Sequence, residues 1–270
     1  MVDRELLELL APGSCLGCGR SPATSRRRLG LCAACFGRLS RLPAGCSRCG
    51  RPLRIEPLPA GYCCGRCRLS PPAVDQLWAL YQYASPLAEV IRAVKFHRRV
   101  DLVEPLGRLV AEPLRSELAG YDALVPVPLH WLRRLRRGYD QAEGLARAMS
   151  APLGLPVVKG LVRRRATRAQ SSLARDERLR NLEGSFRARP AGFSTGAALL
   201  LVDDVVTSGA TLEAAARTLL GAGAGKVAAV VVARTPEPEE VGEGLQASWA
   251  VPPMGGESVS RGGHSLEIRP

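Results

Sequence analysis

The chain has 270 residues, of which 46% are hydrophobic and 4% aromatic, and its formal net charge is +13. This length can bury a full core, with room for one large domain and a smaller one. No apolar run reaches the roughly 18 residues that a membrane helix needs, and residues 1–11 lack the unbroken apolar core of a secretion signal, so we expect a cytoplasmic protein without membrane insertion.

The charge is distributed unevenly along the chain. Residues 1–72 carry 12 basic and 4 acidic groups, residues 73–235 carry 24 and 15, and residues 236–270 carry 2 and 6. A basic, arginine-rich surface suits phosphate groups, including those of single-stranded DNA. An arginine tract such as the one between residues 133 and 137 is, however, also typical of a solvated face.

Eight of the nine cysteines form four CxxC pairs near the N-terminus. The pairs are Cys15 and Cys18, Cys32 and Cys35, Cys46 and Cys49, and Cys64 and Cys67, and Cys63 is left over. Two thiolates separated by two residues can face one metal ion, and a second pair some 10–20 residues later completes a tetrahedral site. We therefore predict two structural zinc sites, one from the first four paired cysteines and one from the last four.

Disulfides and a redox-active CxxC are the rival interpretations of these cysteines. Disulfides need an oxidising compartment and an even count, and a redox motif would be one CxxC at a helix start. Iron could occupy similar thiolates and stays an alternative to zinc. A segment this short and this poor in aromatic and branched residues needs its metal to fold. We expect residues 1–72 to form an N-terminal double zinc ribbon.

Beyond a linker at residues 68–77 the pattern changes to that of an α/β domain. In chain order it predicts a strand or hairpin edge at 77–84, a helix beginning at 85–86, a helix at 102–118, a strand at 123–127, a helix around 142–149, a strand at 198–202, a helix around 212–219 and a strand at 227–233. Strands alternating with helices indicate a mostly parallel sheet with ligands at the carboxyl ends of its strands. We expect this domain to span residues 73–235, followed by a disordered acidic tail over 236–270.

Two adjacent carboxylates follow the predicted strand at 198–202. Because a charged pair cannot remain in an apolar core, Asp203 and Asp204 must emerge at the carboxyl edge of the sheet. Residues 207–211 read Thr-Ser-Gly-Ala-Thr and supply hydroxyls and backbone N–H groups at a helix start, which is typical of an anion site. Carboxylates accept hydrogen bonds from ribose hydroxyls, so we predict a sugar phosphate held at both ends.

The stretch over residues 202–211, VDDVVTSGAT, resembles the phosphoribosyl diphosphate signature of the type I phosphoribosyltransferases. The wider arrangement resembles the ComF family of competence-associated proteins, in which a double zinc ribbon precedes a phosphoribosyltransferase domain. Further matching stretches lie at 91–96, 125–129, 137–141, 168–170 and 178–181. The resemblance, over about residues 15–234, implies a type I phosphoribosyltransferase-like parallel sheet flanked by helices.

The resemblance also implies roles for individual residues, although it assigns no catalytic one. Asp203 and Asp204 would bind the ribose 2- and 3-hydroxyls, and the 5-phosphate would lie on Thr207, Ser208, Gly209, Ala210 and Thr211. Pyrophosphate would meet the loop and flap residues Pro126, Val127, Pro128, Arg137, Gly138, Gln170 and Arg178, with residues 163–182 as a mobile basic flap. Magnesium would bridge the diphosphate and ribose oxygens.

Three positions depart from the family's pattern. Thr207 stands where several purine transferases have a third acidic residue, so general-base catalysis from this loop is not expected. Ser208 replaces a threonine and keeps the hydroxyl. Asp140 stands where the family usually has asparagine, which adds a negative charge next to the predicted phosphate region.

Three functions from different classes remain. A phosphoribosyltransferase with an unidentified acceptor would release pyrophosphate from phosphoribosyl diphosphate. A non-catalytic factor in DNA uptake would bind single-stranded DNA and proteins of DNA uptake, use its sugar phosphate site as a structural or sensory element, and lose affinity steeply with salt. A scaffold would use its zinc ribbons for protein contacts. The family resemblance favours the second over the third, and the intact signature keeps the first open.

Overall fold

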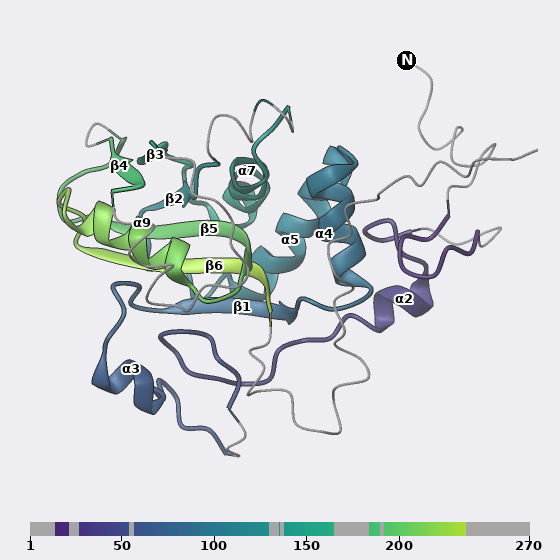
Figure 1. The fold of residues 1–270 in the computed structure, drawn as a ribbon, viewed down its shortest axis with the longest axis horizontal. Helices are drawn as coiled ribbons and strands as arrows, with labels where there is room; N and C mark the ends of the chain where they lie inside the picture. The colour runs from purple at the N-terminus through teal and green to yellow at the C-terminus, as the bar shows by residue number, and fades with distance from the viewer. Residues whose placement is uncertain are drawn as a thin grey trace, which may run out of the picture.

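A four-stranded parallel sheet forms the centre of the molecule in a computed structural model that describes residues 14–21, 27–53, 57–129, 135, 138–164, 184–189 and 192–235 (Figure 1). Its order is β1 (Leu77–Gln82), β6 (Lys226–Arg234), β5 (Ala198–Val206) and β2 (Ala123–Pro126). All three neighbouring pairs are parallel, which confirms the predicted sheet. Among the described residues, no helix combines the length and the apolar composition that crossing a membrane requires.

Helices cover both faces of this sheet (Figure 1). One face carries α4 (Leu87–Phe96), η1 (Val100–Leu102), α5 (Val103–Leu114) and α7 (Gln141–Leu153), and the other carries α9 (Ala210–Leu220). Side chains of β5 alternate between the two layers, as the period of a strand requires. Leu200 and Val202 belong to the α4, α5 and α7 core, whereas Leu199 and Leu201 belong to the α9 core. The strand is therefore apolar on both faces.

Strand β5 is longer than its sequence predicted. The predicted end at residue 202 is wrong, because the strand continues to Val206 and keeps its register with β6. Asp203 stands opposite Val231, and Val206 stands opposite Arg234. The two aspartates thus lie within the last part of the strand, where backbone pairing fixes their positions, and the hydroxyl-rich turn begins only after Val206.

Two short strands that the sequence did not predict lie beside the main sheet. β3 (Leu161–Arg163) and β4 (Phe186–Ala188) pair antiparallel in a separate two-stranded sheet. They bracket most of the flap predicted over residues 163–182, of which only Arg163 and Arg164 lie within the described residues. The base of the predicted flap is therefore anchored, with Phe186 buried in the α9 core.

The N-terminal region contains two cysteine-bearing units, which we call the first ribbon (Cys15 to Cys35) and the second ribbon (Cys46 to Cys67). Each contains one short helix, α2 (Ala33–Gly37) in the first and α3 (Gly65–Leu69) in the second. The first ribbon shares its core with the α/β domain, because Cys15, Leu31 and Cys35 are buried in the cluster that also contains α4 and α5. The first ribbon therefore packs directly on the domain, whereas the cysteines of the second ribbon form a cluster of their own.

Residues 40–47 comprise the connection between the ribbons and the first two residues of the second ribbon. They run antiparallel along the edge of β1 that does not pair with β6. Leu42 N–H donates to the carbonyl of Leu80 at 2.9 Å, Gln82 N–H donates to Ser40 at 2.9 Å, and Leu77 N–H donates to Ser47 at 3.0 Å. Arg41 stands opposite Tyr81 between the first two of these bonds. Because an unpaired edge invites association with other chains, this segment also protects the sheet.

Replacing Leu42 with proline should destabilise this connection. The substitution removes the N–H that donates to Leu80, and we expect the free energy of unfolding to fall by about 1–3 kcal/mol in thermal or denaturant unfolding of the zinc-loaded protein. Arg41→Pro is the matched control, because a residue between two such hydrogen bonds points its N–H away from the partner strand. Equal losses for the two variants would contradict the pairing.

Candidate functional site

Two groups of four thiols form in the ribbons. The sulfurs of Cys15, Cys18, Cys32 and Cys35 lie within 4.8 Å of one another, as do those of Cys46, Cys49, Cys64 and Cys67. Ligands of tetrahedral zinc with bonds of about 2.3 Å lie roughly 3.8 Å apart. The Sγ–Sγ separation is 4.0 Å between Cys18 and Cys32 and 3.9 Å between Cys49 and Cys64. All nine cysteines lie within the described residues and are free of disulfides, so the predicted grouping is confirmed.

The two thiol groups are built in the same way. The first cysteine of the second pair donates its N–H to the first cysteine of the group, from Cys32 to the Cys15 sulfur at 3.2 Å and from Cys64 to the Cys46 sulfur at 3.3 Å. Burial raises the pKa of Cys15, but N–H groups that include that of Cys32 outweigh it and lower the pKa to about 6. A lowered pKa favours the thiolate, which is the form that binds zinc.

A polar pocket of about 180 Å³, which we call the aspartate pocket, opens at the carboxyl ends of β2 and β5. Its polar lining consists of Lys95, Gln141, Arg163, Asp203, Asp204 and Thr211. Open parallel sheets bind ligands at this edge. The two predicted aspartates therefore face a space that can hold a ligand.

The two aspartates differ in their surroundings. Asp204 Oδ2 forms an ion pair with Lys95 Nζ at 3.0 Å, with only 14% of the aspartate side chain exposed. Asp203 Oδ1 accepts the N–H of Asp204 at 2.8 Å. Burial, and then the neighbouring charge of Asp204, raise the pKa of Asp203 to about 7. Lys95 thus neutralises Asp204, whereas the carboxyl of Asp203, with its pKa of about 7, can accept hydrogen bonds from hydroxyl donors.

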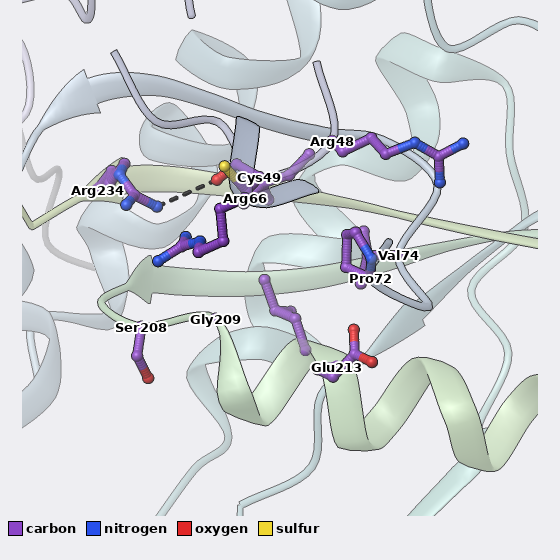
Figure 2. A pocket seen from close by; sticks show the side chains of 11 residues that line it. Arg48, Cys49, Arg66, Pro72, Val74, Ser208, Gly209, Glu213 and Arg234 are labelled. Carbon is purple, nitrogen blue, oxygen red and sulfur yellow. Dashed lines mark hydrogen bonds between the residues drawn. The ribbon is translucent and has the colours of Figure 1, made fainter. Parts of the chain in front are cut away.

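The turn after β5 divides the residues predicted to bind phosphate. Gly209 has φ +78° and precedes α9 as its N-cap, a left-handed conformation that suits glycine. Thr211 lines the aspartate pocket, whereas Ser208 and Gly209 line a second, much smaller pocket that they share with the second ribbon (Figure 2). Ala210 is buried and Thr207 is exposed. The turn therefore has one side toward the aspartates and another toward the zinc ribbon.

The predicted pyrophosphate residues are only partly brought together. Val127 and Pro128 line the aspartate pocket, and Pro126 is the buried last residue of β2. Gly138, with φ +78°, lies in the turn before α7 and outside the pocket lining. The remaining three, Arg137, Gln170 and Arg178, lie outside the described residues.

Asp140, the position that departs from the family's asparagine, is the N-cap of α7. Its carboxylate accepts the N–H groups of Ala142 at 3.1 Å and Glu143 at 3.3 Å, as capping aspartates do. It also accepts the N–H of Leu129 at 3.1 Å. The aspartate therefore holds the segment after β2 against the start of α7, and this explains its place next to the aspartate pocket.

Three polar residues of the pocket lining, Lys95, Gln141 and Arg163, were assigned no individual role from the sequence, although they lie in the stretches 91–96, 137–141 and 163–182 that resemble the family. Lys95 lies in the last turn of α4, directly after the apolar stripe of that helix, and a lysine in this position gives no signal by itself. Only the packing of α4 on the sheet brings it to Asp204, which is more than a hundred residues away in sequence. Gln141 is 2% exposed, and its signal in the sequence was its place in the matching stretch 137–141.

Two protein-family models and several known proteins match this chain. A phosphoribosyl transferase domain family matches residues 107–246, and a double zinc ribbon domain family matches residues 6–68. DNA utilization protein YhgH of Salmonella typhimurium is 33% identical over 234 residues, which cover 84% of this chain and 99% of that protein. Competence protein F of Haemophilus influenzae is 31% identical over 70% of this chain and 84% of its own length. Competence protein ComFC of Bacillus subtilis is 27% identical over 72% and 79%, respectively.

Substitution of one cysteine in each group tests the two metal sites. We expect Cys15→Ser and Cys46→Ser each to lose about one of two bound zinc ions, because each removes one ligand from a different group of four. Metal analysis of the purified proteins measures this directly. Cys63→Ser is the control, because Cys63 belongs to neither group, and it should keep both ions. Unchanged zinc in the first two variants would contradict the grouping.

Replacing Asp203 with asparagine should stabilise the ligand-free protein at alkaline pH. The pKa of Asp203 rises from 3.8 to about 7 on folding, so the contribution of this carboxyl to the free energy of unfolding falls as pH rises from about 4 through 7. We expect Asp203→Asn to exceed the wild type by ~1–3 kcal/mol at pH 8.5, and by much less near pH 4, in thermal unfolding.

Asp75→Asn is the control for loss of a negative charge, because Asp75 lies at the opposite edge of the sheet and pairs with Lys226 at 3.4 Å. A pH-independent difference between Asp203→Asn and the wild type would contradict the raised pKa.

Proposed function

The chain belongs to the ComF family of competence-associated proteins, and on this premise we propose that it binds phosphoribosyl diphosphate or a related ribose 5-phosphate in the aspartate pocket. The observation that carries the proposal is the position of Asp203 and Asp204 in one pocket with Thr211, at the end of β5. The carboxylates accept the ribose 2- and 3-hydroxyls, and the turn from Thr207 to Thr211 holds the 5-phosphate at the start of α9.

The diphosphate of this ligand lies toward the segment after β2. Val127 and Pro128 line that side of the aspartate pocket, and Arg163 lies at the base of the proposed flap. Lys95 also lines the aspartate pocket, and its ammonium forms an ion pair with Asp204 at 3.0 Å in the ligand-free protein. The carboxylates of Asp203 and Asp204 are oxygen ligands of the kind that hold magnesium, and the ion would supply cancellation of the negative charge of the diphosphate.

The role proposed for this binding is in DNA uptake or utilization. Two relatives carry competence in their names, and a third is called a DNA utilization protein. The net charge of +13 suits contact with single-stranded DNA. Phosphoribosyl transfer to an acceptor is the enzymatic form of this proposal, in which the flap arginines stabilise the leaving pyrophosphate. A sensory site without transfer is the non-enzymatic form.

Calorimetric titration of phosphoribosyl diphosphate with magnesium into the zinc-loaded protein tests the pocket. We expect saturable binding by the wild type and a loss of at least about tenfold in affinity in the Asp203→Asn/Asp204→Asn variant, because charged hydrogen-bond acceptors to the ribose are removed. Asp75→Asn is the control and should bind as the wild type does. Absence of binding by the wild type, or equal binding by all three proteins, would reject the proposal.

A further inference from the structure

The second pocket lies at the turn over residues 207–211, which we call the signature turn, and is lined by both the second ribbon and the α/β domain. The pocket itself was given no role in the function proposed above. The second ribbon contributes Arg48, Cys49 and Arg66 to it, and the signature turn contributes Ser208 and Gly209 (Figure 2). Cys49 is one of the four thiols of the second metal group. A metal ligand and the proposed phosphate-binding turn therefore face the same small space.

A buried arginine makes the first connection across this pocket. Arg234, 2% exposed, ends β6 and donates from Nη1 to the carbonyl of Cys49 at 3.1 Å (Figure 2). In the sheet it stands opposite Val206, the last residue before the signature turn, and the next N–H, from Thr235, donates to Val206 at 2.9 Å. The second metal site is thus linked through Arg234 to the strand end from which the turn departs.

A buried glutamate makes the second connection, on the other side of the turn. Glu213, 4% exposed, lies in the first turn of α9 and accepts the N–H of Ala73 at 2.8 Å. Ala73 belongs to the segment that follows α3 of the second ribbon. Glu213 also accepts from Arg217 Nε at 2.7 Å, which balances its charge. The second ribbon and the segment that follows it therefore contact the two elements that flank the turn, β6 beside the end of β5 and the first turn of α9.

The first ribbon contacts a different part of the domain. A side chain at Gly17 would approach Pro86 to 2.8 Å, and one at Gly30 would approach Leu102 to 3.6 Å, so this ribbon packs beside α4 and η1. It has its own arginine at a metal ligand, because Arg38 Nη2 donates to the Cys35 sulfur at 3.0 Å. Nothing that the structure describes continues from Arg38 to the signature turn, and this makes Arg38 a natural control.

We propose that Arg234 is a positioning residue that couples the second zinc site to the signature turn, so that metal in the second ribbon and sugar phosphate on the turn strengthen each other. The proposal rests on the proposed function, because it deepens the role of that same turn. A buried guanidinium is costly to desolvate, and an apolar residue of similar size would cost the fold less. The buried position of Arg234 is better explained by the contact that it makes between the second ribbon, at Cys49, and the end of β5, at Val206.

Coupling of this kind has to be reciprocal. If the zinc-bound second ribbon holds the turn in its binding conformation, the ligand on the turn must also stabilise the zinc-bound ribbon. Coupling energies between two sites in proteins usually correspond to a factor of about 5–150 in affinity. We therefore expect measurable effects in both directions, and both should depend on Arg234.

The test compares Arg234→Met with Arg38→Met in the zinc-loaded full chain. Each variant removes a guanidinium that contacts a zinc-ligand cysteine, and both should keep two zinc ions by metal analysis. We expect Arg234→Met to bind phosphoribosyl diphosphate with magnesium about tenfold more weakly than the wild type in calorimetry. Arg38→Met should bind within about twofold of the wild type. Arg234→Lys, which keeps a cationic donor, should recover part of the affinity.

The second readout is the rate at which a chromogenic chelator removes zinc from each protein. In the wild type, phosphoribosyl diphosphate with magnesium should slow the release of one of the two ions, and inorganic pyrophosphate is the control for chelation by the ligand itself. Arg38→Met should show the same protection and Arg234→Met should not. A merely structural role for Arg234 would change stability without removing this ligand-dependent protection.

The outcomes separate this inference from the function on which it rests. A wild type that does not bind the ligand rejects both. A wild type that binds the ligand without protecting either zinc ion rejects the coupling alone, as does an Arg234→Met variant with unchanged affinity and protection. If Arg234→Met does not fold, the wild-type protection and the Arg234→Lys variant still decide between coupling and its absence.

Discussion

The pairing of β5 between β6 and β2 is the interaction on which the rest of the molecule depends. Because both faces of this strand are covered by helices, its polar side chains can appear only near its carboxyl end. That end carries Asp203 and Asp204, and the parallel direction of the sheet brings Val127 and Pro128 of the neighbouring segment to the same edge. One topological constraint thus gathers the residues of the aspartate pocket.

The pocket edge concentrates electrostatic costs that a purely structural domain would avoid. Burial and a like charge raise the pKa of Asp203, and nearby a guanidinium at Arg234 and a carboxylate at Glu213 are almost fully buried. Each feature lowers the stability of the ligand-free chain unless something compensates it. The proposed sugar phosphate with its metal ion would compensate the first, and the backbone of Cys49 in the second ribbon and of Ala73 in the segment after it satisfies part of the other two.

Local patterns in the sequence were enough to predict the sheet, its main helices and both cysteine groups, because these depend on periodicity and on ligand spacing. The end of β5 was misplaced because pairing with β6, and not the polarity of Asp203, decides where a strand stops. The strands β3 and β4 are too short to give a pattern. The pairing of Lys95 with Asp204 and the contact of Arg234 with Cys49 depend on packing between distant segments, and no local signal carries such information.

The position of residues 40–47 along β1 has a consequence for the order of events during synthesis. The ribbons leave the ribosome first and can take up zinc at once, but the strand that their connection joins is completed only when β6, the last described strand, has been made. Until then β1 has a neighbour on one side only. The metal-bound ribbons can therefore serve as an early template that keeps β1 from pairing with other nascent chains while the chain from the end of β1 to the end of β6 is translated.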